Sequence, residues 1–153
     1  MDVRRCLVIH LMASLAASVP VVAQETLAVK AMRAAPQQAS LYEIAFTTTD
    51  PLAADAEIRL TFPSAYDLKH FEIAGSTTIL GGLSWKRDGQ VVTLRRSGLG
   101  AVVPPGQKVS VQLGMIQNPS RFDTAEPLRI EVLPSPKTRT LRTFTSRVEF
   151  LSR

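Results

Sequence analysis

After residue 23, a single histidine is the one side chain that could act as the proton acceptor of a serine–histidine–acid site. His70 lies between Lys69 and Phe71, and no Gly-x-Ser-x-Gly turn accompanies it. Zinc and copper sites need several nitrogen or sulfur ligands, whereas this part of the chain has one histidine and no cysteine. We therefore expect no enzyme activity and no cofactor, and we place His70 at the surface or on an edge strand.

Two pairs of acidic residues could provide carboxylate oxygens for a calcium site or for a hydrolase. Asp50 and Asp55 flank one loop, and Asp123 and Glu126 lie in another. Calcium takes oxygen ligands, but no Asp-x-Asp-x-Asp-Gly loop is present, so solvated turn residues are the favoured interpretation and calcium is the alternative. Two acids can also meet from distant positions in a small hydrolase. One Trp and two Tyr offer few platforms for a sugar, however, and the chain has no phosphate loop or dinucleotide fingerprint.

The first 23 residues are typical of a secretory signal peptide. Arg4 and Arg5 precede a mostly apolar run from Cys6 to Val19, which is shorter than the roughly 20 residues of a membrane-spanning helix. Val21-Val22-Ala23 supplies a cleavage site, so we expect residues 1–23 to be removed and residues 24–153 to form one domain. A retained membrane anchor is the alternative. Cleavage predicts a periplasmic, secreted or cell-surface protein without a stable membrane span.

The net positive charge of residues 24–153 is concentrated near the C-terminus. Residues 137–153 hold five basic side chains and one acid, whereas residues 24–136 are balanced. These charges could solvate an edge strand, which is the favoured interpretation, or contact an anionic envelope polymer. Trp85 is either a core residue between two sheets, which is favoured, or an exposed binding anchor. The candidate partner contacts are therefore Trp85, Lys137, Arg139 and Arg142.

Alternating apolar and polar residues predict short strands that are buried on one face. The pattern is clearest in residues 57–62, 108–113 and 128–132. Asp88-Gly89 between two extended runs predicts a tight hairpin. The side chains predicted to be buried are Ile58, Leu60, Phe62, Val109, Val111, Leu113, Ile130 and Val132.

The last stretch of the chain also alternates. Phe144, Val148 and Phe150 share one face, which predicts a terminal strand in the fold with Arg147 and Glu149 toward water. Eight or nine short strands separated by turn signals, with no amphipathic helix, predict an all-β protein of two packed antiparallel sheets. A closed barrel is the main rival.

Two stretches resemble immunoglobulin-like modules of bacterial and archaeal surface proteins. Residues 46–66 run from a Thr-rich strand through Pro51-Leu52 into Ile58-Arg59-Leu60-Thr61-Phe62-Pro63, and residues 105–120 end in Gly114-Met115-Ile116-Gln117-Asn118-Pro119. The resemblance covers about residues 42–134. It implies an immunoglobulin-like antiparallel β-sandwich of about eight short strands, following the signal peptide.

From this fold and setting, we expect an exported, non-catalytic structural or binding module of the cell envelope. Adhesion, matrix assembly and an accessory role in an envelope complex all fit, with a protein or an anionic envelope polymer as the partner and no nucleic acid. The alternatives are a pilin-like fibre subunit that assembles by strand exchange and, less favoured, a small extracellular hydrolase. The sequence leaves the oligomeric state open.

Overall fold

The computed structural model describes residues 27–123, 126–137 and 141–151. The predicted signal peptide and the predicted contact Arg139 lie outside these residues. The described residues contain no helix that is long and apolar enough to span a membrane. They form ten strands, with these bounds: β1 Leu27–Ala31, β2 Ala39–Thr47, β3 Glu57–Thr61, β4 Glu72–Gly75, β5 Leu83–Asp88, β6 Val91–Arg96, β7 Lys108–Gln117, β8 Leu128–Leu133, β9 Arg142–Ser146 and β10 Val148–Phe150.

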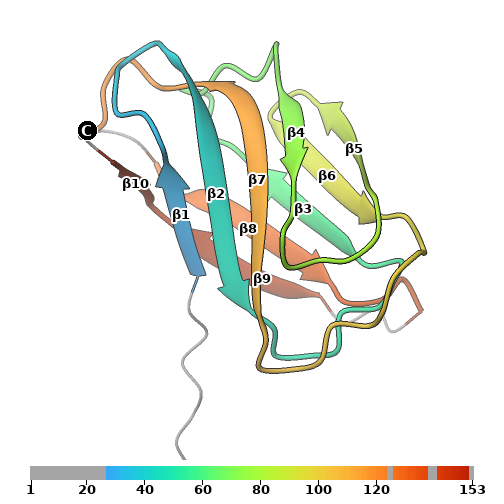
Figure 1. Cartoon of the computed structure of the whole chain (residues 1–153). Coiled ribbons are helices and arrows are strands. Elements are labelled where there is room, and N and C mark those ends of the chain that lie inside the picture. Colours follow the sequence, from blue (N-terminus) through green and yellow to red (C-terminus); the bar gives the residue numbers. More distant parts are fainter. Residues whose placement is uncertain (1–26, 124–125, 138–140, 152–153) are drawn as a thin grey trace, which may run out of the picture.

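The strands build two five-stranded sheets that pack face to face (Figure 1). One sheet has the order β10-β1-β2-β7-β4, and the other has the order β5-β6-β3-β8-β9. All pairs are antiparallel except β1 with β10, which is parallel. The two open sheets confirm the predicted sandwich, and the closed barrel is not formed.

The sandwich core is built from the alternating positions of the strands. All eight side chains predicted to be buried are at most 5% exposed. Period-two alternation identifies them because successive side chains of a strand point to opposite faces of a sheet. Buried residues from both sheets form one continuous cluster, against which Phe144, Val148 and Phe150 also pack.

The C-terminal run contributes a strand to each sheet rather than a single strand to one. β9 pairs with β8, and after Arg147 the chain continues as β10 beside β1 (Figure 1). Phe144 is therefore placed by one sheet and Phe150 by the other. Arg147 and Glu149 are exposed, as their alternation predicts.

The predicted β-hairpin joins β5 to β6, with a turn shifted by one residue from Asp88-Gly89. Asp88 pairs with Val91, so Gly89 and Gln90 are the two turn residues. Gly89 alone of the two has a positive φ, of 56°. Glycine at the first of two turn positions is the type II′ pattern, whose twist matches that of the flanking strands.

Asn118 explains why an Asn-Pro turn stands at the end of β7. Its side chain is buried, and its Nδ2 donates to the carbonyl oxygens of Arg33 at 2.7 Å and Ala35 at 2.9 Å. The Tyr42 hydroxyl donates to Asn118 Oδ1. The amide thus satisfies loop carbonyls that would otherwise lack partners in the interior, and it fixes the loop between β1 and β2.

The two tyrosines give this core a spectroscopic signature at high pH. Tyr42 and Tyr66 are the only tyrosines of the whole chain, and both are buried. Burial raises the pKa of Tyr66 to about 12 and the pKa of Tyr42 further, because the interior disfavours the phenolate. Below pH 10 both states hold their phenolic protons. Between pH 10 and about 12 the unfolded chain loses these protons first, so stability falls as pH rises.

We therefore expect almost no tyrosinate absorbance at 295 nm at pH 10.5 while the circular dichroism spectrum is still that of the folded protein. The absorbance should then rise together with unfolding. The same protein in 8 M urea serves as the control and should titrate near pH 10. A folded protein that titrates near pH 10 would show that the tyrosines are solvated.

Candidate functional site: an apolar hollow at the end of one sheet

A β-bulge in β7 shapes one end of the outer face of the sheet β10-β1-β2-β7-β4. Ser40 pairs with Ile116 and Tyr42 with Leu113, so Leu41 of β2 lies opposite two residues, Gly114 and Met115. Met115 has a φ of 59°, in the left-handed region that side chains other than glycine seldom adopt. Strained residues of this kind cost of order 1–3 kcal/mol and concentrate at functional sites.

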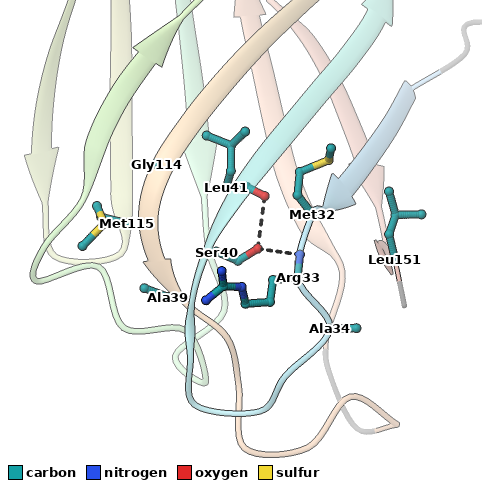
Figure 2. Close-up of a pocket in the computed structure, with 9 residues that line it drawn as sticks. All are labelled: Met32, Arg33, Ala34, Ala39, Ser40, Leu41, Gly114, Met115 and Leu151. Carbon is teal, nitrogen blue, oxygen red and sulfur yellow. Dashed lines mark hydrogen bonds between the residues drawn. The ribbon is translucent and has the colours of Figure 1, made fainter. Parts of the chain in front are cut away.

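The bulge borders an open hollow of about 560 Å³, shown in Figure 2. In this view Met115 lies on one side of Leu41, and Met32 and Leu151 lie on the other. We call this feature the methionine hollow; its lining is Met32, Arg33, Ala34, Ala39, Ser40, Leu41, Gly114, Met115 and Leu151.

Both methionines that follow residue 23 line the hollow and are substantially exposed, at 41% for Met32 and 48% for Met115. They come from different parts of the chain, since Met32 directly follows β1 and Met115 lies in the bulge of β7. Methionine is flexible and polarisable, so it adapts to the shape of a bound apolar group. Apolar surface that stays exposed in a concave site indicates binding rather than stabilisation of the fold.

Ser40 holds the wall of the hollow in place. The Arg33 backbone N–H donates to Ser40 Oγ at 3.0 Å, and Ser40 Oγ donates to the Leu41 carbonyl at 3.2 Å (Figure 2). The nine lining residues include no acid, histidine or cysteine. The hollow therefore offers apolar contact, one cationic side chain, Arg33, and the Ser40 hydroxyl, and its lining holds no histidine or acid that would activate this hydroxyl.

The side chains considered for catalysis and metal binding lie elsewhere. His70 is exposed, in the segment that leads into β4. Within the described ranges, no three histidine, cysteine, aspartate or glutamate side chains gather as metal ligands. Asp50 instead accepts a 2.7 Å hydrogen bond from Arg142 Nε, which holds the pKa of that carboxyl below its ordinary value. Asp123 lies 3.3 Å from Arg121.

Trp85 is not the core residue that the favoured sequence interpretation expected. It lies on β5, an edge strand, with 43% of its surface exposed. Its ring packs edge-to-face on Phe71, with the ring centroids 5.0 Å apart. The core between the sheets is filled by aliphatic and aromatic side chains of the inner strands, so the indole covers Phe71 from outside.

The structure does not bring the predicted partner contacts together. Trp85 lies on β5, whereas Arg142 begins β9 at the opposite edge of the same sheet. From β5 to β9 there are four strand-to-strand steps of about 4.8 Å each, so the two edges are roughly 19 Å apart. Lys137 is exposed after β8, and Arg142 is engaged with Asp50. Trp85 and Arg142 therefore belong to separate surfaces.

Sequence reasoning missed the methionine hollow because it depends on strand register. Met115 follows Leu113 in a strongly alternating strand, and only the bulge turns it outward beside Leu41. A weak signal was present, since neither of the two methionines after residue 23 was among the residues predicted to be buried.

Comparison with known proteins identifies similar folds among solved structures. No protein-family model and no curated protein matches the chain. Among solved structures, an uncharacterised protein from Nocardia farcinica with an immunoglobulin-like fold is 17% identical with a TM-score of 0.51, and the match covers 78% of this chain and 81% of that one. The full-length major pilin SpaD from Corynebacterium diphtheriae is 15% identical with a TM-score of 0.51, with 82% of this chain and 34% of the pilin covered.

A GH20 exo-β-N-acetylglucosaminidase from Vibrio harveyi also matches, at 13% identity and a TM-score of 0.45. The match covers 84% of this chain but only 18% of the enzyme. The sequence resemblance and the structural similarity agree on the fold: the residues that the structure describes have the architecture of an immunoglobulin-like β-sandwich.

Proposed function

We propose that the protein is an exported, non-catalytic binding module of the cell envelope or surface, and that it binds a protein partner at the methionine hollow. Residues 1–23 direct export and are removed, which leaves residues 24–153 in the periplasm or outside the cell. The observation that carries the proposal is the exposed apolar hollow, in which a strained backbone at Met115 holds a flexible side chain at the surface.

The chemistry of the lining defines the partner. Met32, Met115 and Leu41 accept an apolar side chain, because burying it removes apolar surface of both proteins from water. Arg33 is the one charged residue of the lining and favours a carboxylate next to that side chain. The partner is therefore a protein that presents a large apolar residue beside an acid. The flexible methionines supply most of the contact.

A charged residue in the hollow should abolish this binding without unfolding the domain. In Met115→Glu, a carboxylate replaces the thioether at an exposed position, so we expect partner affinity to fall at least tenfold. Met115→Leu should retain it. Leu99→Glu is the matched control, because Leu99 is 71% exposed and is not part of the hollow.

The measurement starts with capture from an envelope extract on immobilised residues 24–153. Captured proteins are then purified and titrated against the wild type and the three variants by calorimetry. Equal affinity for the wild type and Met115→Glu, or an equal loss in Leu99→Glu, would contradict the hollow as the binding site. Turnover of an envelope substrate by the purified wild type would contradict the non-catalytic assignment.

A further inference from the structure

Three arginines form a diagonal across the outer face of the second sheet, β5-β6-β3-β8-β9. Arg95 of β6 pairs with Glu57 of β3, two residues before Arg59. Arg129 of β8 pairs with Thr61, two residues after Arg59. Arg95, Arg59 and Arg129 therefore step by one strand and two residues each time, which sets neighbouring Cα atoms about 8 Å apart. We call this set the arginine diagonal.

Two acids of the same face, Glu57 and Glu131, lie beside the guanidinium groups and are less exposed than the arginines. Glu131 has 9% of its side chain exposed and accepts a 2.6 Å hydrogen bond from Arg129 Nη2, and Arg59 Nη1 lies 3.5 Å from its other oxygen. Glu57 is 28% exposed, 3.9 Å from Arg95 Nε. The arginine side chains are themselves 52–59% exposed. The covered acids position the guanidinium groups, whose remaining N–H donors face solvent.

The rest of this face is mostly polar, and none of its outward positions holds an aromatic side chain. By register, its other outward positions are Thr61, Thr93, Thr143, Thr145, Ser84, Lys86, the half-buried Val91 and Leu133, and the exposed Asp88 at the end of β5. A folded protein partner normally needs a buried aromatic or aliphatic anchor. A polyanion does not, because its affinity comes from charge pairing and the release of counterions.

We propose that the arginine diagonal binds a linear polyanion, an envelope polymer that carries carboxylate or phosphate groups along its length. Arginine suits such a ligand because its planar fork pairs with either group through two parallel hydrogen bonds. This face belongs to the sheet opposite the one that carries the methionine hollow. The two surfaces can therefore bind their ligands at the same time, so that the domain links a protein partner to an anionic polymer.

The proposal predicts salt-sensitive binding to two probes, polygalacturonate for carboxylate and polyphosphate for phosphate, with neutral dextran as the negative control. In 20 mM NaCl the wild-type domain should bind at least one charged polymer and should release it in 500 mM NaCl. The probe that binds more tightly identifies the anionic group. No binding to either polymer at low salt would overturn the proposal.

Matched variants separate a specific face from net charge. Arg59→Gln, Arg95→Gln and Arg129→Gln combined should lower affinity at least tenfold. The control combination Lys108→Gln, Arg121→Gln and Lys137→Gln removes the same charge from exposed positions elsewhere and should change the affinity less than threefold. An equal loss in both combinations would overturn the proposal.

The triple variant of Arg59, Arg95 and Arg129 leaves the largely buried Glu131 without its ion-pair partners and could therefore lower stability. A second variant tests the same face without this effect. Thr143→Glu with Thr145→Glu adds two acids at exposed positions of β9 and removes no ion pair given by the structure. It should also weaken polymer binding, whereas unchanged affinity in this folded variant would argue against the face. None of these three combinations should affect the partner titrations at the methionine hollow, because none of the substituted residues lines it.

Discussion

Replacing Arg96 with methionine is expected to cost about 3–5 kcal/mol of folding stability, the range seen when one side of a buried charged hydrogen-bond network is removed. Arg96 is only 2% exposed. Its Nη1 donates to the carbonyls of Leu52 at 2.8 Å and Ala53 at 2.7 Å, and its Nη2 to those of Leu80 at 3.1 Å and Ala101 at 2.7 Å. One side chain thereby ties three loops together at one end of the sandwich.

The loss is large because the methionine side chain of this variant would fill the space but donate no hydrogen bond. The Leu80 and Ala101 carbonyls would lose the donor that the structure gives them, whereas those of Leu52 and Ala53 would keep the backbone N–H groups of Val103 and Ala56. Each buried unpaired group costs about 1–3 kcal/mol unless water reaches it. Burial lowers the pKa of Arg96, and the nearby Asp55 carboxylate opposes this change. The guanidinium nevertheless stays protonated at any ordinary pH.

Arg95→Met is the matched control, one residue away on the same strand. Its side chain is 59% exposed and 3.9 Å from Glu57, so its removal should cost less than about 1 kcal/mol. Urea unfolding followed by circular dichroism gives both values. If Arg96→Met loses no more stability than Arg95→Met, the loops are not held by this guanidinium.

Deleting residues 137–153 should abolish cooperative folding. β9 pairs with β8 along five positions, and β10 pairs with β1, so the deletion removes an edge strand from each sheet. It also removes Phe144, which packs on Phe46, and Phe150, which stacks on Phe122 with the ring centroids 3.9 Å apart. The exposed core would then lack the burial on which a disulfide-free domain of this size depends.

Thermal melts of the full and truncated proteins, with size-exclusion chromatography, provide the measurement. The truncated form should melt without a cooperative transition or aggregate. A truncated protein that stays monomeric and as heat-resistant as the full chain would mean that the segment is a tail. The full chain should be a monomer, because its own terminal strands fill the sandwich; a concentration-dependent ladder would instead favour the fibre subunit.

Alternation along strands was enough to predict the core side chains of β3, β7 and β8, because the period of two depends only on local geometry. Leu60 and Val111 could be assigned in this way without knowledge of their partners. The pairing of Leu41 with Gly114 and Met115 could not, because a bulge depends on the register of strands that are distant in sequence.

Buried polar residues were the other feature that sequence could not place. Arg96 is the last residue of β6, whose inner face holds Val92, Leu94 and Arg96. The alternation therefore predicts that Arg96 is buried, whereas its charge predicts that it is exposed. Arg96 is buried because four backbone carbonyls accept hydrogen bonds from its guanidinium group. These carbonyls belong to loops, and the path of a loop cannot be predicted from the periodicity of the sequence. The three arginines of the diagonal were each visible as outward residues, but their alignment required the register of three strands.

The binding-module account is tested most directly by photo-crosslinking from the methionine hollow in living cells. A photoreactive amino acid at position 115 should form one major crosslinked species with an envelope protein, which an excess of the unmodified wild-type domain should compete away. The same amino acid at position 99, which is exposed outside the hollow, should not form it. Equal crosslinking from both positions, or none from position 115 in a folded and exported protein, would contradict the account.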